Sequence, residues 1–102
     1  MEVRHYITID DVDPFQSWLD GMPDAVTKVV IVRRLDRIAL GNFGDHKFCG
    51  DGVWELRIDY GPGYRIYYGQ AGRAIVLLLC GGTKRTQTKD IQTAKKFWAD
   101  FK

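Results

Sequence analysis

Two alternating segments joined by a tight turn constrain the fold of this chain more than any other feature of its sequence. From Val53 to Asp59, and again from Tyr64 to Gly69, large apolar residues recur at every second position, as in strands that bury one face. The connecting Gly61-Pro62-Gly63 is a strong turn signal. Because antiparallel strands need only a short connection, the two segments are predicted to pair as a β-hairpin.

The alternation gives this hairpin an apolar face and a polar face. The side chains expected on the polar face are Glu55, Arg57, Arg65 and Tyr67, and those expected on the core face are Trp54, Leu56, Ile58 and Ile66. Two guanidiniums, a carboxylate and a phenol on an open sheet face could bind a phosphate, because arginine presents a planar fork of donors. An ordinary solvated face with Glu–Arg pairs across the strands is the alternative interpretation.

Helix signals and apolar runs predict the remaining elements. Asp13-Pro14 is typical of a helix start, and the short helix that follows is broken by Gly21 and Pro23. A second helix opens at Pro23-Asp24 and ends at Gly41. The other predicted elements are a strand over residues 3–9, a loop over 41–52, a central strand over 75–79 that is apolar on both faces, and a last helix over 88–101.

The resulting element order is β-α-α-β-β-β-α. It predicts an α+β fold in which helices pack on one face of a curved, mainly antiparallel sheet. With 102 residues, of which 45% are hydrophobic, the chain has the size and apolar content of a single domain covering residues 1–102.

Composition excludes few classes of partner. The formal net charge of +2 neither requires nor excludes a nucleic acid. Cys49 and Cys80 match neither a disulfide framework nor a metal-site spacing. The N-terminal residues form no signal peptide, and the longest apolar run, Ala74–Cys80, is too short to span a bilayer. We therefore expect a cytoplasmic protein with no bound metal, no cofactor and no membrane association.

A second group of cations follows the predicted central strand. Lys84 and Arg85 lie just before the last helix, where the free N–H groups of a helix start favour anions. A polar loop with a threonine cap is the alternative interpretation, and the spacing matches no Walker-type phosphate loop.

Three stretches together resemble HigB-like members of the RelE/ParE superfamily, the phage-derived addiction module killer proteins. The segment Gly52–Tyr68 is similar to the hairpin of those proteins. The segment Leu78–Gln87 with Asp90-Ile91 resembles their motif at the end of the sheet, and Gly41–Asp45 with Lys47 resembles the loop before the hairpin. The order of elements agrees along essentially the whole chain.

The resemblance implies a compact RelE-type fold and the toxin of a type II toxin–antitoxin system. It also implies a cognate antitoxin, expected to be of the helix-turn-helix type and encoded by an adjacent gene. The nuclease members of the superfamily cleave mRNA on the ribosome and so inhibit translation, through attack of a ribose 2′-OH on the adjacent phosphate. That reaction needs a base, cations for the charge of the phosphorane and an acid for the leaving oxygen.

Carried over residue by residue, the resemblance assigns catalytic roles to three arginines. Arg65 follows Gly63-Tyr64 and matches an arginine that stabilises the transition state. Arg57 matches a basic position on the preceding strand and is also expected to bind RNA, and Arg85 matches the cation after the last strand. Lys47 and Lys84 are expected to bind RNA, and Tyr67 is a candidate general acid because of its place on the polar face.

The chain also departs from RelE itself. Glu55 occupies the place of a lysine, and Ile91 occupies the place of a tyrosine near the C-terminus. The general acid and base are therefore not assigned by the resemblance. His46 is the only histidine in the loop, and we interpret it as a solvated side chain.

Two other functions stay open beside the ribosome-dependent nuclease. One is a ParE-like toxin that binds DNA gyrase without catalysing a reaction, and the other is a degenerate, non-toxic interaction module. The fold is common to all three, so it cannot decide between them. Convergence of Arg57, Arg65 and Arg85 on one concave site would favour the nuclease, and dispersal would favour a binding protein.

Overall fold

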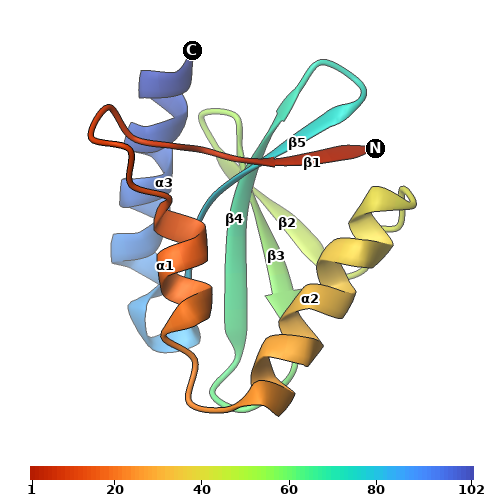
Figure 1. The fold of residues 1–102 in the computed structure, drawn as a ribbon. Coiled ribbons are helices and arrows are strands. Elements are labelled where there is room, and N and C mark those ends of the chain that lie inside the picture. Colours follow the sequence, from red (N-terminus) through yellow and green to blue (C-terminus); the bar gives the residue numbers. More distant parts are fainter.

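The structure, a computed structural model that describes residues 1–102, contains a five-stranded mixed sheet and three α-helices. The sheet order is β1-β5-β4-β3-β2, with β1 parallel to β5 and the other neighbours antiparallel (Figure 1). The elements in chain order are β1 (Glu2–His5), α1 (Pro14–Asp20), α2 (Ala25–Ala39), β2 (His46–Gly50), β3 (Val53–Ile58), β4 (Tyr64–Ala71), β5 (Ile75–Thr83), the 3-10 turn η1 (Lys84–Thr86) and α3 (Gln87–Phe101). The α+β fold expected from the sequence is confirmed.

The predicted hairpin is formed by β3 and β4. Their register pairs Arg57 with Arg65 and Glu55 with Tyr67, so these four side chains share a face, as the alternation predicted. Gly63 in the connecting turn has a φ of +82°, a left-handed conformation that glycine adopts without steric cost.

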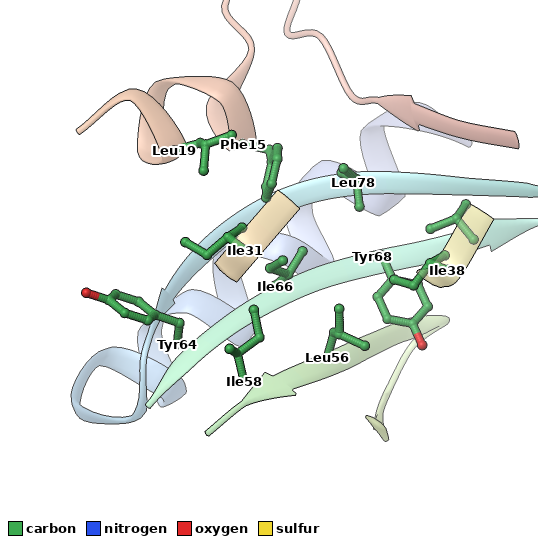
Figure 2. Close-up of a cluster of buried hydrophobic side chains, with 11 residues drawn as sticks. Phe15, Leu19, Ile31, Ile38, Leu56, Ile58, Tyr64, Ile66, Tyr68 and Leu78 are labelled. Atoms are coloured by element: carbon green, nitrogen blue, oxygen red, sulfur yellow. The ribbon is translucent and has the colours of Figure 1, made fainter. Parts of the chain in front are cut away.

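Helices cover both faces of the sheet, so the expectation that they pack on one face is wrong. On one face, α1 and α2 pack against the apolar side of the hairpin and β5, and Figure 2 shows Phe15, Leu19, Ile31 and Ile38 among the strand residues there. On the other face, α3 packs Ala94 and Trp98 against a second cluster that includes Val53, Tyr67, Leu77 and Leu79. The apolar stripe of α3 therefore lies over part of the hairpin face that the sequence marked as polar.

The two N-terminal helices begin where their capping signals predict. The side chain of Asp13 accepts a hydrogen bond from the backbone N–H of Gln16, and that of Asp24 accepts one from the backbone N–H of Thr27. Each carboxylate satisfies an N–H that the helix itself leaves free. The predicted central strand is also confirmed, since β5 buries side chains on both of its faces.

Three predicted boundaries are wrong. The central strand, predicted over 75–79, continues as β5 to Thr83. The segment 41–52, predicted as a loop, contains β2, an edge strand that pairs with β3 and has a bulge between Phe48 and Gly50. Most of β2 is exposed, so it lacks the apolar alternation by which a half-buried strand is recognised. The first strand ends at His5 rather than continuing to Ile9, which is almost fully exposed.

None of the helices is both long and apolar enough to cross a membrane.

Candidate anion-binding groove

Two arginines and a lysine line one hollow at the turn end of the hairpin. This hollow, called the arginine groove below, has a volume of about 260 Å³ and is lined by Asp45, Arg57, Ile58, Asp59, Gly63, Arg65 and Lys84. The cross-strand pairing of β3 and β4 places Arg57 beside Arg65. Guanidinium and ammonium groups brought together in this way can bind a phosphate or another anion.

Gly63 brings Lys84 to the same place as Arg65. Its carbonyl oxygen accepts hydrogen bonds from the backbone N–H of Lys84 at 2.8 Å and from Nη1 of Arg65 at 3.0 Å. A Cβ at position 63 would lie 3.2 Å from that Nη1 and 3.5 Å from the Cβ of Lys84. The glycine therefore lets the end of β5 approach the hairpin turn, so that cations distant in sequence share one groove.

Glu55 lies beneath the arginines and is completely buried, which contradicts the expectation that it is exposed on an open polar face. Its Oε1 accepts a hydrogen bond from Nε of Arg57 at 3.0 Å and lies 3.5 Å from Nε of Arg65. Its Oε2 accepts a hydrogen bond from Nε2 of Gln87 at 2.7 Å. Gln87 begins α3, so one buried carboxylate connects the hairpin to the start of the last helix.

Tyr67 is also completely buried, so the expectation that the polar face exposes it is wrong. Its hydroxyl has no hydrogen-bond partner in the protein. Burial, reinforced by the negative charge of Glu55, raises the pKa of this phenol well above its usual value. A phenol enclosed under α3 packs in the core and does not reach the arginine groove.

The other cations suggested by the sequence lie outside the groove lining. Arg85 is exposed in η1 and does not line the groove, whereas the neighbouring Lys84 does. Lys47 is exposed on β2, where it pairs in register with Glu55. Arg57 and Arg65 therefore share one groove, but Arg85 does not line it, so the predicted convergence of the three arginines is met only in part, and Lys84 is the third cation of the lining.

Two carboxylates that were not predicted as site residues also belong to the groove lining. Asp45 and Asp59 line the same hollow as the three cations. The alternation of β3 already placed Asp59 on the arginine face, but Asp45 reaches the groove only because β2 folds back on β3. These carboxylates partly offset the positive charge of the groove.

Arg34 of α2 fixes the position of Asp45. Its Nη1 donates a hydrogen bond to the carbonyl oxygen of Arg57 at 2.5 Å, and its Nη2 donates one to the carbonyl oxygen of Phe43 at 3.0 Å. The backbone N–H of Arg57 in turn donates to the carbonyl oxygen of Asp45 at 2.9 Å. Nothing local to Arg34 in the sequence marks this long-range contact.

The side chain of His46 is exposed, as expected for a solvated histidine. Its Nδ1 lies 2.8 Å from the carbonyl oxygen of Gly44, and its ring lies beside those of Phe43 and Trp54. It does not line the arginine groove. No group of three or more His, Cys, Asp or Glu side chains is arranged to hold a metal ion.

Comparisons with known proteins find one matching family model and one similar protein. A sequence model described as phage-derived protein Gp49-like (DUF891) matches residues 17–99 of the chain. An uncharacterized protein of Haemophilus influenzae (strain ATCC 51907 / DSM 11121 / KW20 / Rd) is 49% identical over 81 residues, which are 79% of this chain and 82% of the relative. The matched residues include the hairpin, the groove and most of α3.

Proposed function

Because the chain belongs to the phage-derived Gp49-like family, a family of addiction module killer proteins, we propose that it is the toxin of a type II toxin–antitoxin pair. We further propose that it is a ribosome-dependent endoribonuclease that cleaves mRNA and so inhibits translation. The single observation that carries this proposal is the convergence of Arg57, Arg65 and Lys84 on the arginine groove. A ribosomal target would place the protein in the cytoplasm.

In this proposal the groove holds the phosphate at which the RNA is cut. The 2′-OH of the preceding ribose loses its proton and attacks this phosphate. The bond to the 5′-oxygen of the next nucleotide breaks, that oxygen takes up a proton, and a 2′,3′-cyclic phosphate is left. The nucleophile therefore comes from the substrate, and the reaction calls for no cofactor or metal. The guanidinium of Arg65 stabilises the charge that develops on the phosphorane oxygens, and Arg57 and Lys84 bind the same group. Lys47 and Arg85, exposed outside the groove, bind neighbouring phosphates of the chain.

Proton transfer is not assigned to a side chain of the groove. Tyr67, the candidate acid, is enclosed under α3, and we assign it a packing role instead. Asp45 and Asp59 are the two carboxylates that line the groove. A carboxylate within reach of the 2′-OH can accept its proton, so these two are the groups to substitute first.

The direct test is to induce the chain alone in bacteria and to map new 5′ ends on translated mRNAs. Cuts within translated codons are expected, and they should be lost in the double variant Arg57→Lys/Lys84→Ala, which keeps a positive charge beside Glu55 and whose folding is checked by a melting curve. Arg73→Ala is the matched control, because Arg73 is an exposed arginine in the turn after β4, outside the groove. Growth inhibition without any mRNA cleavage would contradict the nuclease proposal.

A second candidate function is a ParE-like toxin that binds DNA gyrase and catalyses nothing. The observation that favours it is the mixed charge of the groove, in which Asp45 and Asp59 oppose the cations and no acid for the leaving group is assigned. Gyrase-dependent DNA breaks after induction, with intact mRNA, would support this alternative. A chain that causes neither effect would be a non-toxic interaction module.

The proposal also includes an antitoxin, expected to be of helix-turn-helix type and encoded by an adjacent gene. Co-expression with the flanking open reading frames should yield a stable complex with one product and should restore growth. If neither flanking product binds the chain, the two-gene interpretation is wrong.

A further inference from the structure

We propose that Glu55 is a positioning residue, whose buried carboxylate holds the guanidiniums of Arg57 and Arg65 so that their terminal nitrogens face an anion in the arginine groove. The carboxylate contacts both arginines through their Nε atoms, at 3.0 Å for Arg57 and 3.5 Å for Arg65. This inference goes beyond the proposed function and rests on it only in taking the anion to be a phosphate of RNA.

The contacts leave three of the four terminal nitrogens of the two arginines free for an anion. Arg65 is held by its ion pair with Glu55, in which its Nε makes no hydrogen bond, and by its Nη1, which donates to the carbonyl oxygen of Gly63. Its Nη2 and both terminal nitrogens of Arg57 make no hydrogen bond within the protein. Because a guanidinium is planar, fixing its Nε side sets the direction in which the remaining N–H groups point.

The burial of Glu55 means that it acts through the arginines rather than on a substrate. None of its surface is exposed, and its second oxygen is occupied by Nε2 of Gln87 at 2.7 Å. An uncompensated carboxylate in such a place would be costly. Two adjacent guanidiniums, in turn, would repel one another without a negative charge between them. The carboxylate and the arginine pair therefore stabilise one arrangement together.

The test combines NMR of the arginine Nε–Hε groups with a titration of inorganic phosphate. In the parent chain, Arg57 and Arg65 should give sharp Nε–Hε signals distinct from those of exposed arginines, and phosphate should shift them together with Lys84. Glu55→Gln keeps the shape of the side chain and removes its charge. Asp51→Asn is the matched control, because Asp51 is exposed and pairs with Lys95 at 3.5 Å, outside the groove lining.

The variants separate positioning from the other possible roles of the carboxylate. Removing a negative charge would by itself tighten phosphate binding. Loss of positioning predicts that Glu55→Gln weakens phosphate binding by about ten- to hundredfold, the scale of one charge-assisted hydrogen bond. The two Nε–Hε signals should also move to the positions of exposed arginines, and Asp51→Asn should change neither measurement.

Each outcome bears on one proposal. If the parent chain binds no phosphate at these residues, the anion groove of the proposed function is wrong. If the parent binds phosphate and Glu55→Gln binds it equally or more tightly, the groove stands and the positioning role is wrong. Should Glu55→Gln not fold, Glu55→Asp keeps the charge and draws the carboxylate away from the two Nε atoms. Unchanged arginine signals and unchanged phosphate affinity in Glu55→Asp would then overturn the positioning role.

Discussion

At the scale of single residues, alternation identified which side chains share a face but could not tell which of them are buried. Arg57 and Arg65 were predicted on one face from sequence and lie there. The side chain of Arg65, however, is only 12% exposed, and Glu55 is completely buried. Burial depends on what covers the strand, and the covering helix begins more than twenty residues later in the chain.

This burial changes what substitution of Arg65 is expected to do. An outward-facing arginine could be truncated within about ±0.5 kcal/mol of the parent stability. Removing a partner of a buried carboxylate instead costs about 1–3 kcal/mol. Arg65→Ala therefore confounds lost stability with lost activity, and a variant that keeps the positive charge is the better probe.

We predict that Arg65→Lys stays folded and loses most of its mRNA cleavage. Lysine retains a charge near Glu55, but a point charge cannot contact the carboxylate and the phosphate at once in the way a planar guanidinium can. Loss of one preorganised donor of this kind lowers the rate by about 10²–10³. Cleavage in cells and a melting curve, compared with those of Arg73→Lys, measure the two effects. A folded Arg65→Lys with parental cleavage would count against the role of Arg65.

At the scale of elements, the sequence predicted what each segment forms better than where the segments lie. The hairpin, the central strand and the helix starts followed from period and capping, because these signals are local. The placement of α3 did not, because the apolar stripe of a helix shows that it packs on something without showing on which sheet face. The edge strand β2 was missed because few of its residues are buried.

We predict that Gly69→Ala destabilises the packing of α3 on the sheet. A Cβ at Gly69 would lie 2.4 Å from Cε3 and Cζ3 of Trp98, so the helix or the ring must shift. Forcing extra volume into a packed contact costs typically about 1–3 kcal/mol. The change in the free energy of unfolding is measured by urea denaturation followed by tryptophan fluorescence.

Gly21→Ala is the matched control for this substitution. Its Cβ would meet only backbone oxygens of the preceding helix at 3.5 and 3.6 Å, an ordinary contact distance. We expect its stability to stay within about ±0.5 kcal/mol of the parent. Equal stabilities for the two alanine variants would mean that Trp98 does not lie against Gly69 as described.

At the scale of the whole molecule, helices on both faces of the sheet enclose two separate cores, and tyrosines are buried in both. The hydroxyl of Tyr6 donates a hydrogen bond to Oδ2 of Asp100 at 2.5 Å. That bond, together with burial, raises the pKa of Tyr6 to about 12. Burial also raises the pKa of Tyr67 and of Tyr68. The folded molecule therefore retains phenolic protons at a pH where an unfolded chain, with tyrosine pKa values of about 10, releases them.

We predict that the free energy of unfolding falls steeply between pH 10 and pH 12. Over that range the unfolded chain binds fewer protons than the native protein, so stability decreases as pH rises, by up to about 1.4 kcal/mol per pH unit for each such tyrosine. Tyr6→Phe removes one of these titrations and should flatten the decline. Its stability at neutral pH should be lower by about 1 kcal/mol, since a hydrogen bond is lost.

Asp100→Asn gives the intermediate case for the same titration. The amide oxygen can still accept the hydrogen bond from Tyr6, but the negative charge that opposes ionisation of the phenol is gone. The decline in stability should then begin at the same pH as in the parent chain, because the tyrosine pKa of the unfolded chain sets that point, and should end at a lower pH. Urea denaturation of the three proteins at half-unit steps from pH 8 to pH 12 measures the slopes. A Tyr6→Phe variant with the same slope as the parent would show that Tyr6 does not keep its proton in the folded protein. The hydrogen bond between Tyr6 and Asp100 of α3 would then be wrong.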